Sequence, residues 1–439
     1  MTLLEELEAR GLIHQTTEHE EPLGKHLATP GRVVYAGFDP TAPSLHVGHL
    51  IPLLGLRRFQ RVGHRAVALA GGATGLVGDP SGKSEERNLL DREALAFNRD
   101  RIKAQLAKFL DFDGANPAVL VDNLDWTGGL TLLDFLRDTG KHFKVNQMIH
   151  KDSVKTRLER DGAGISFTEF TYMLLQANDY LVLARERGCT LQIGGSDQWG
   201  NITAGIELIR RVLGRHVYGA TCPLLTNADG SKFGKTVAGA VWLDPAQTSP
   251  FAFRQFWFQT PDADVVTRLK QFTFLPLDEV DALAQGVAAG SAPNAAQRAL
   301  ARHMTALVHG EAEAARVEKA VDVLFSKDGD LREIPAEYLA DAFAGAPTVE
   351  VPRGELAGDG LPLVDLVVRT IYAGEQKRGA AKRDVTERAI ALNGRPAVDP
   401  QANVGLADLL HDRFLVVRKG KKNHVLVRVV DGERAGAAG

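Results

Sequence analysis

The sequence predicts an α/β fold: a doubly wound parallel sheet, followed by an α-helical domain and a small α+β domain. Three observations carry this prediction. Short apolar runs alternate with helical patterns in the first half, the pattern beyond Pro250 is helical, and residues 361–430 begin helical and end in two alternating apolar runs. The βαβαβ order of the first half implies parallel strands with helices on both faces. Ligands of such sheets bind at the carboxyl ends of the strands.

The elements of the first half follow one another along the chain. The expected strands are short apolar runs at 33–38, 66–70, 117–122 and 190–193. The expected helices repeat apolar residues at helical spacing, at 50–59, 91–111 and 166–186. A polar, helical stretch at about 124–164 lies between two strands, so we expect it to be an insertion.

Shifts in composition predict the domain boundaries. The first domain covers residues 1–248 and contains a mobile loop at 229–239, and an α-helical domain follows at 249–345. A stretch rich in Gly, Pro and Val at 346–360 is typical of a linker. The last domain covers residues 361–434.

The composition is that of a globular protein with several domains. The 439 residues are 44% hydrophobic and 24% charged, with a net charge of −3. Residues 369–434 carry 14 Lys/Arg and 8 Asp/Glu, a net charge of +6 that leaves −9 for the rest of the chain. Such asymmetry favours a tail that faces nucleic acid.

Nothing in the pattern indicates export or a membrane span. Residues 1–21 are polar and acidic without the apolar core of a signal peptide, and no run reaches the roughly 18 apolar residues of a span. The two cysteines, Cys189 and Cys222, form no CxxC pair, which suits a reducing compartment. We therefore expect a cytoplasmic protein.

Two histidines follow the first strand of the predicted sheet. His46 and His49 lie three residues apart at the expected start of a helix, after a turn rich in proline. A helix N-terminus offers free N–H groups and a partial positive charge, so this place suits a phosphate. A metal site is less favoured, because HxxH lacks a third ligand nearby. Without this context a structural or surface role would be the better interpretation.

Two lysines lie in a glycine-rich segment. Lys232 and Lys235 belong to the run KFGKT at 232–236, with glycines at positions 230, 234 and 239. We expect a loop that closes over charged phosphates. For this segment alone, a solvated basic loop is the simpler interpretation. Together with the two histidines, however, the two lysines favour a triphosphate site.

Residues 78–84, GDPSGKS, resemble a phosphate-binding P-loop. The motif GxxxxGK[ST] requires glycine five residues before Gly82, and that position is Val77. We therefore discount a Walker-type NTPase. We expect the nearby glycines to allow close approach of a ligand to the backbone. They are Gly71, Gly72, Gly75 and Gly78.

A polar stripe runs along the expected helix 166–186. Tyr172, Gln176 and Asp179 lie three and four residues apart and share one face. Buried polar groups need partners, which a small polar ligand would supply. Spacing alone leaves a surface stripe as an equal alternative.

Basic residues cluster in the tail, where phosphate binding competes with a plain solvated face as the interpretation. They are Lys377, Arg378, Lys382, Arg383, Arg388, Arg395, Arg418, Lys419, Lys421 and Lys422.

Taken together, these segments resemble the class I aminoacyl-tRNA synthetases, and among them the bacterial tyrosyl-tRNA synthetases. The resemblance extends from residue 1 to about 430. It rests on six motifs in the same order, at 35–41, 46–49, 71–83, 166–179, 192–203 and 231–236. It implies a Rossmann-like catalytic domain, a helical anticodon-binding domain and an S4-like RNA-binding domain. It further implies that L-tyrosine is activated with ATP and Mg²⁺, that tyrosine is transferred to the 3′ end of tRNA(Tyr), and that the protein is a homodimer.

The resemblance also implies a role for each candidate residue. Tyr35 and Asp179 would bind the phenol hydroxyl of the substrate, and its α-ammonium would be held by Asp79, Tyr172 and Gln176, with Gln198 near the reacting carboxylate. The ATP and adenylate site would be lined by Gly37, Asp39, His46, Gly48, His49, Gly195, Asp197, Lys232, Phe233, Gly234 and Lys235. The triphosphate would be stabilised by Thr41, His46, His49, Lys232 and Lys235. RNA would be contacted by Lys377, Arg378, Lys382, Arg383, Lys419, Lys421 and Lys422. No side chain is expected to hold a resident metal.

The chain departs from the family pattern at Ala36, where many relatives carry a small thiol near the ribose, while Pro52 and Asn178 are variable positions.

Three rival interpretations remain. A tryptophanyl-tRNA or other class I synthetase is disfavoured by Tyr35, Asp179 and the tail. A small-molecule nucleotidylyltransferase is disfavoured by the long extension after Pro250. A noncatalytic RNA-binding protein is disfavoured by the intact histidines and lysines.

Overall fold

The computed structural model describes residues 1–81, 90–151, 154–155, 158, 164–228, 230, 233–236, 239–326, 329–420 and 423–432. The chain divides into two compact units. Unit 1 comprises Met1–Gln247 and Trp257–Val308, and unit 2 comprises Thr248–Phe256 and His309–Gly439. Within the described residues, no helix is long and apolar enough to cross a membrane. The domain boundaries expected from the sequence stay a prediction.

A six-stranded sheet forms the centre of unit 1. Its strands lie in the order β1-β6-β5-β2-β3-β4, and all neighbours are parallel except the short β1, which is antiparallel to β6. The strands are β1 (Gln15–Thr16), β2 (Val33–Phe38), β3 (Arg65–Ala70), β4 (Val119–Asp122), β5 (Cys189–Gly195) and β6 (Tyr218–Cys222). The chain runs outward from β2 through β3 to β4 and then returns to β5. The order therefore reverses between β2 and β5, which confirms a doubly wound sheet.

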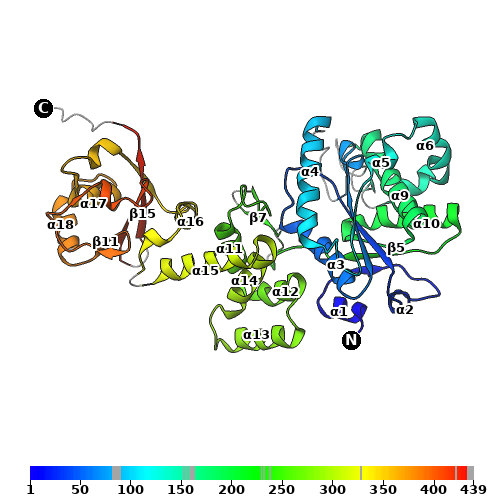
Figure 1. Cartoon of the computed structure of the whole chain (residues 1–439), viewed down its shortest axis with the longest axis horizontal. Helices are drawn as coiled ribbons and strands as arrows, with labels where there is room; N and C mark the ends of the chain where they lie inside the picture. The colour runs from blue at the N-terminus through cyan, green and yellow to red at the C-terminus, as the bar shows by residue number, and fades with distance from the viewer. Residues whose placement is uncertain are drawn as a thin grey trace. The chain divides into compact units, whose positions relative to one another are not determined.

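Helices cover both faces of this sheet (Figure 1). Those on one side are α3 (Leu50–Arg61) and α4 (Arg92–Phe109), and those on the other are α9 (Phe167–Arg187) and α10 (Trp199–Leu213). Because both faces are buried, β2 reads as a continuous apolar run rather than an alternating one. Its Val33 and Tyr35 pack in a core with α9 and α10.

Local sequence sets the ends of α9, the helix that carries the polar stripe. The hydroxyl of Ser166 accepts a hydrogen bond from the Glu169 N–H and caps the first turn. Gly188 ends the helix with φ of +65°, a left-handed conformation that glycine adopts at low cost. The expected helix at 166–186 is thus confirmed within a residue at each end.

The segment between β4 and α9 consists of short helices where it is described. They are α5 (Leu124–Thr127), α6 (Leu132–Asp138) and α7 (Val145–Met148). Earlier in the chain lie α1 (Leu3–Ala9) and α2 (Leu23–Leu27). The segment beyond residue 250 is helical, as expected, with α11 (Pro250–Phe258), α12 (Asp262–Phe272), α13 (Leu277–Ala289), α14 (Ala295–His309), α15 (Glu311–Phe325) and α16 (Ala336–Ala342).

Unit 2 contains a five-stranded sheet in the order β12-β11-β14-β15-β9. The strands are β9 (Thr348–Pro352), β11 (Ile390–Leu392), β12 (Arg395–Pro396), β14 (Phe414–Lys419) and β15 (Asn423–Val430). All of them except the short, exposed β12 share a core with α17 (Leu363–Thr370) and α18 (Arg378–Thr386). Strand β9 pairs in parallel with β15, whereas the other pairs are antiparallel. Residues 348–352, expected in a linker, therefore contribute a strand to this sheet.

Candidate active site

The candidate residues gather where the strand order reverses. Asp39 directly follows β2, Asn123 follows β4, and Gln198 ends the short helix η4 (Ser196–Gln198) that follows β5. The carboxyl ends of parallel strands meet at one edge, so these side chains are brought together. Helix α9 supplies Tyr172 and Asp179, both of which are buried.

Tyr35 lies in the middle of β2 with its side chain turned toward α9. Its ring packs 5.2 Å from that of Tyr180, and the residue is 1% exposed. Among the described residues its hydroxyl has no hydrogen-bond partner. Burial, together with the charge of Asp179, raises the pKa of this phenol well above its ordinary value. The group therefore stays protonated and can donate to a ligand.

Asp179 is the buried carboxylate of the same pocket. Its Oδ1 accepts a hydrogen bond of 2.8 Å from Trp126 Nε1, and its Oδ2 accepts one of 2.9 Å from Asn123 Nδ2. Burial raises the pKa of Asp179 to about 7, although both hydrogen bonds lower it. An uncharged hydroxyl is therefore a better partner for this pocket than a second anion.

The hydrogen bonds around Asp179 continue across the strand ends to Tyr172. Asn123 Nδ2 also donates to Thr74 Oγ1 at 2.9 Å, and Thr74 Oγ1 donates to Asp39 Oδ1 at 2.7 Å. The Tyr172 hydroxyl donates to the other oxygen of Asp39 at 2.8 Å. Asp39 thus fixes the end of β2 to α9, and Tyr172 is held by Asp39 rather than by a bond to Asp79.

A second network surrounds Asp79. Its Oδ2 accepts a bond of 2.7 Å from Gln198 Nε2, and its Oδ1 lies 3.4 Å from Asn201 Nδ2. The Asn201 amide also lies 3.1 Å from Gln176 Oε1 and 3.3 Å from Gln198 Oε1. Three residues predicted from the sequence therefore converge on one buried asparagine of α10. This arrangement presents acceptor oxygens suited to an ammonium group.

The glycines after β3 make room for carboxylates of the protein itself. A Cβ at Gly71 would lie 2.0 Å from Asp39 Oδ1, and one at Gly72 would lie 2.3 Å from Asp122 Oδ1. We expected these glycines to let a ligand approach the backbone. The packing of the strand ends is by itself a reason for glycine at positions 71 and 72, and the approach of a ligand to the backbone stays a prediction.

His46 and His49 lie together at the start of α3. The short helix η1 (Val47–His49) leads into α3, and the two imidazole centroids are 4.0 Å apart. His49 Nδ1 accepts from the His46 N–H, and His46 Nδ1 accepts from the Gly48 N–H, each at 3.1 Å. Because Nδ1 is the acceptor in both rings, their neutral tautomers carry the proton on Nε2.

The lysine loop, residues 229–239, is described at 230, 233–236 and 239. Lys232 lies outside the described residues, while Lys235 belongs to strand β7 (Lys235–Thr236), which pairs with β8 (Gly239–Ala240). Gly234 has φ of +79°, and a Cβ there would lie 2.6 Å from Val47 Cγ2. The loop therefore abuts the histidine motif, although about 190 residues separate them in sequence.

The other candidates of unit 1 lie at the same edge. Gly37 is exposed in β2, and the exposed Thr41 donates its N–H to the Asp39 carbonyl at 2.9 Å. Gly195 ends β5, where a Cβ would lie 2.6 Å from Asp197 Oδ1.

Among the described residues, no group of three His, Cys, Asp or Glu side chains is arranged to hold a metal ion.

The predicted RNA-binding residues belong to unit 2. Lys382 and Arg383 are exposed on α18, Lys377 precedes that helix, and Arg378 forms an ion pair with Asp365. Lys419 lies 2.6 Å from Asp384 and 2.9 Å from the Tyr372 hydroxyl, so its charge is already paired. Lys421 and Lys422 lie outside the described residues.

Sequence reasoning missed four residues of the networks. They are Thr74, Asn123, Trp126 and Asn201. A usable signal existed for Asn123, because a polar residue at the carboxyl end of a buried strand commonly faces the site. Trp126 and Asn201 lie on helices, and only the packing of those helices against α9 reveals their partners.

Comparison with known proteins decides the family. A model for class I tRNA synthetases of the W and Y type matches residues 29–326, and one for the SYY-like C-terminal domain of tyrosine–tRNA ligase matches 339–427. A tyrosine–tRNA ligase of Roseiflexus castenholzii is 49% identical over 430 residues, which cover 98% of this chain and 100% of the relative. The chain belongs to the tyrosine–tRNA ligase family of class I synthetases.

Other relatives agree with this family. A tyrosine–tRNA ligase of Yersinia pestis is 49% identical over 428 residues, covering 97% of this chain and 98% of the relative. A solved, C-terminally truncated mitochondrial tyrosyl-tRNA synthetase of Aspergillus nidulans has a TM-score of 0.65 and 33% identity, covering 74% of this chain and 94% of its own. A solved tryptophanyl-tRNA synthetase of Encephalitozoon cuniculi shares the fold alone. Its identity is 16% and its TM-score 0.51, and the match covers 75% of this chain and 90% of that chain. The resemblance predicted from the sequence, and the class I fold with it, are confirmed.

Proposed function

We propose that this chain carries out the tyrosine–tRNA ligase reaction with the residues of the candidate site. L-Tyrosine reacts with ATP to give tyrosyl-adenylate and pyrophosphate, and the tyrosyl group is then transferred to the 3′ end of tRNA(Tyr). One observation carries the assignment of the amino acid. The Tyr35 hydroxyl is buried without a hydrogen-bond partner among the described residues, beside the carboxylate of Asp179. A phenol hydroxyl satisfies both groups, because it donates to Asp179 and accepts from Tyr35.

The α-ammonium of tyrosine is assigned to the network around Asp79. Asp79, Gln176 and Gln198 already direct oxygens toward Asn201, and an ammonium group offers three donors to such acceptors. Tyr172, buried on the same helix face and bonded to Asp39, closes this side of the site. The carboxylate of the substrate then projects toward the carboxyl ends of β2 and β5.

The first reaction step needs no general base. The substrate carboxylate is ionised at neutral pH and attacks the α-phosphorus of ATP, while pyrophosphate leaves. Negative charge grows on the β- and γ-phosphates as the bond breaks, so positioned donors lower the barrier. We assign this role to Thr41, His46, His49, Lys232 and Lys235. ATP would enter as its Mg²⁺ complex, with the metal as part of the substrate.

The ribose and adenylate lie, in this proposal, along the ends of the two central strands. The exposed Gly37, together with Gly48 and Gly195, leaves backbone open to the nucleotide, and Asp197 supplies a carboxylate for ribose hydroxyls. Phe233 and Gly234 border the site from the lysine loop. The proposal assigns no ribose contact to Ala36, because its side chain carries no polar group.

The phosphate roles are tested by separating binding from chemistry. His46→Ala and Lys235→Ala should lower the single-turnover rate of adenylate formation by about 10²-fold or more. Their dissociation constants for tyrosine should stay within about twofold of the parent, because neither residue belongs to the tyrosine pocket. A loss in tyrosine affinity with an unchanged rate would contradict the assignment.

We also propose that the protein is a homodimer. The insertion and the start of α9 expose large apolar side chains, with Leu132 71%, Leu133 77% and Phe167 76% exposed. Large apolar side chains that are exposed in one chain would be covered in a protein interface. Sedimentation should give about twice the 47.5 kDa of one chain, and Leu133→Glu should lower it to the monomer mass. A parent that sediments at 47.5 kDa would refute the dimer.

Unit 2 is proposed to bind tRNA(Tyr) through the exposed basic residues of α18.

We place the reaction in the cytoplasm, a reducing compartment that suits two unpaired cysteines, Cys189 and Cys222.

A further inference from the structure

Phe233, in the middle of the lysine loop, packs into a cluster of buried residues from the helices of unit 1. Its ring centroid lies 5.6 Å from that of Trp257 and 5.6 Å from that of Phe272. These two rings meet edge to face at 4.8 Å, and neither is exposed. The guanidinium carbon of Arg268 lies 4.4 Å from the centroid of Phe233, in a cation–π contact.

Helix α12 also holds the chain that leads into the loop. The Arg268 side chain is 3% exposed, and it donates one hydrogen bond to the Thr226 carbonyl and another, at 3.0 Å, to Gln271 Oε1. Asp264, one turn earlier on α12, accepts from the Ala228 N–H at 3.2 Å. Residues on both sides of Lys232 are therefore fixed to a single helix.

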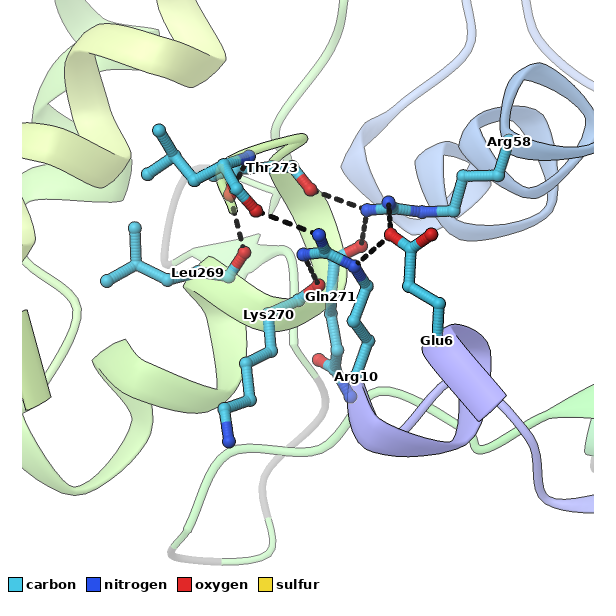
Figure 2. Close-up of polar contacts among 8 residues, drawn as sticks. Glu6, Arg10, Arg58, Leu269, Lys270, Gln271 and Thr273 are labelled. Atoms are coloured by element: carbon cyan, nitrogen blue, oxygen red, sulfur yellow. Dashed lines mark hydrogen bonds and ion pairs between the residues drawn. The ribbon is translucent and has the colours of Figure 1, made fainter. Parts of the chain in front are cut away.

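The same helix is tied to the elements that carry the histidines. Figure 2 shows Arg58 of α3 and Arg10, the residue directly after α1, directed at backbone carbonyls around the end of α12. Glu6 bridges the two guanidinium groups. Arg58 donates to the carbonyls of Thr273 and Gln271 at 2.5 and 3.5 Å, and Arg10 to those of Leu275 and Lys270 at 2.8 and 3.3 Å. Because α3 begins directly after His49, both halves of the phosphate site are anchored to α12.

We propose that α12 positions the lysine loop for adenylate formation, with Arg268, Trp257 and Phe272 acting as positioning residues that hold Phe233. This inference rests on the proposed function, because it concerns the step in which pyrophosphate leaves. Charge stabilisation of that step requires the lysines to lie at a fixed place relative to His46 and His49, and an error of about 1 Å can cost about 10²-fold in rate. Lysine cannot replace Arg268, because it lacks the planar fork that donates twice and stacks on a ring.

The test compares Arg268→Lys with the parent in two measurements. The single-turnover rate of adenylate formation at saturating tyrosine and ATP should fall by about 10- to 100-fold, whereas the dissociation constant for tyrosine should stay within about twofold. Arg298→Ala is the matched control, because Arg298 is exposed on α14 of the same unit and donates to the Pro293 carbonyl. It should leave both quantities unchanged.

A second variant keeps the proposal falsifiable if Arg268→Lys disturbs folding. Phe233→Leu leaves the core of α12 intact but removes the ring under Arg268, and it should give the same loss of rate with the same tyrosine affinity. The double variant should lose clearly less than the product of the two single losses, because each change breaks the same contact between Arg268 and Phe233. Full rates in both single variants, or independent losses that multiply, would overturn the proposal. A parent protein that forms no adenylate would refute the proposed function instead.

Discussion

Tyr35 is the single residue on which the proposed tyrosine pocket depends most directly. In the free protein it is desolvated and has no hydrogen-bond partner among the described residues, a state that costs free energy until a ligand arrives. In the proposed role, the unmet hydrogen bond would make the pocket selective, because a ligand without a hydroxyl would leave the Tyr35 hydroxyl unsatisfied.

Tyr35→Phe should therefore separate binding from stability. We expect the dissociation constant for tyrosine to rise about 2- to 13-fold, which corresponds to the loss of one neutral hydrogen bond. The melting temperature should stay level or rise, because the variant removes an unsatisfied polar group. Equilibrium binding and thermal unfolding measure the two effects, and a lower melting temperature with unchanged affinity would contradict this role.

The pKa of Asp179 predicts how stability depends on pH. Burial raises this pKa from 3.8 to about 7, so the folded protein binds the proton more tightly than the unfolded chain between those values. Ionising Asp179 in the fold therefore costs stability as the pH rises from about 4 to about 7, and the full cost applies above about 7.

Asp179→Asn remains uncharged throughout this range. Its stability relative to the parent should increase as the pH rises from about 4 to about 8, as chemical denaturation at several pH values would show. A difference that stays constant with pH would mean that Asp179 is not the group that titrates. The same variant should bind tyrosine poorly at every pH, because it replaces the carboxylate acceptor.

At the scale of elements, the lysine loop packs closely against the histidine motif at Gly234. Gly234 needs both its left-handed conformation and its missing side chain, since a Cβ would collide with the buried Val47. Gly230 in the same loop also has a left-handed conformation, with φ of +82°, but a Cβ there would meet nothing within 4 Å.

This pair of glycines gives a matched comparison. Gly234→Ala should lower the rate of adenylate formation by about tenfold or more, because the loop must move away from His46 and His49. Gly230→Ala carries the conformational cost without the collision and should have a smaller effect. Stopped-flow measurement of both variants decides the point, and equal losses would show that backbone strain alone is responsible.

The sequence predicted the elements whose signals are local. Strands β2 and β3 and helices α4 and α9 were placed within about two residues, because buried parallel strands are short apolar runs and α9 has a serine cap and a terminal glycine. Strand β9 was missed, because it lies at the sheet edge in a segment rich in Pro and Gly. Strand β9 pairs with β15, and the first residues paired, Thr348 and Leu426, are 78 positions apart in the chain. Such a long-range pairing leaves no local pattern in the sequence.

The candidate site was predicted unevenly for a related reason. The spacing of Tyr172, Gln176 and Asp179 indicated one helix face, but the roles of these residues came from resemblance to a family. Asn201 and Arg268 lie among ordinary helical residues. The distant partners of Asn201 are Gln176 and Asp79, 25 and 122 positions away in the chain. Those of Arg268 are Phe233 and Thr226, 35 and 42 positions away. Only the packing of helices brings such contacts into view.

At the scale of the whole molecule, the proposed function divides the work between the two units, with the chemistry in unit 1 and RNA binding in unit 2. All residues assigned to tyrosine and ATP belong to unit 1, whereas the basic residues of α18 belong to unit 2. A change in α18 should therefore affect the second step of the reaction and leave the first intact.

The double variant Lys382→Ala/Arg383→Ala tests this division. Charging of tRNA should weaken, and the dependence of tRNA binding on log salt should lose about one unit of slope for each phosphate contact removed. Pyrophosphate exchange with tyrosine should match the parent. Arg185→Ala, which removes an exposed arginine of α9 in unit 1, is the control. Unchanged tRNA binding would remove α18 from the RNA surface.

The central claim is that this pocket recognises the phenol hydroxyl of tyrosine during activation. ATP–pyrophosphate exchange with the purified parent protein tests this claim most directly. Tyrosine, phenylalanine and tryptophan would be supplied separately. Exchange should occur with tyrosine, with phenylalanine weaker by about 10⁴-fold or more, as is known for tyrosyl-tRNA synthetases as a class. Comparable exchange with phenylalanine or tryptophan would contradict the roles of Tyr35 and Asp179, and no exchange with any of the three would contradict the proposed function.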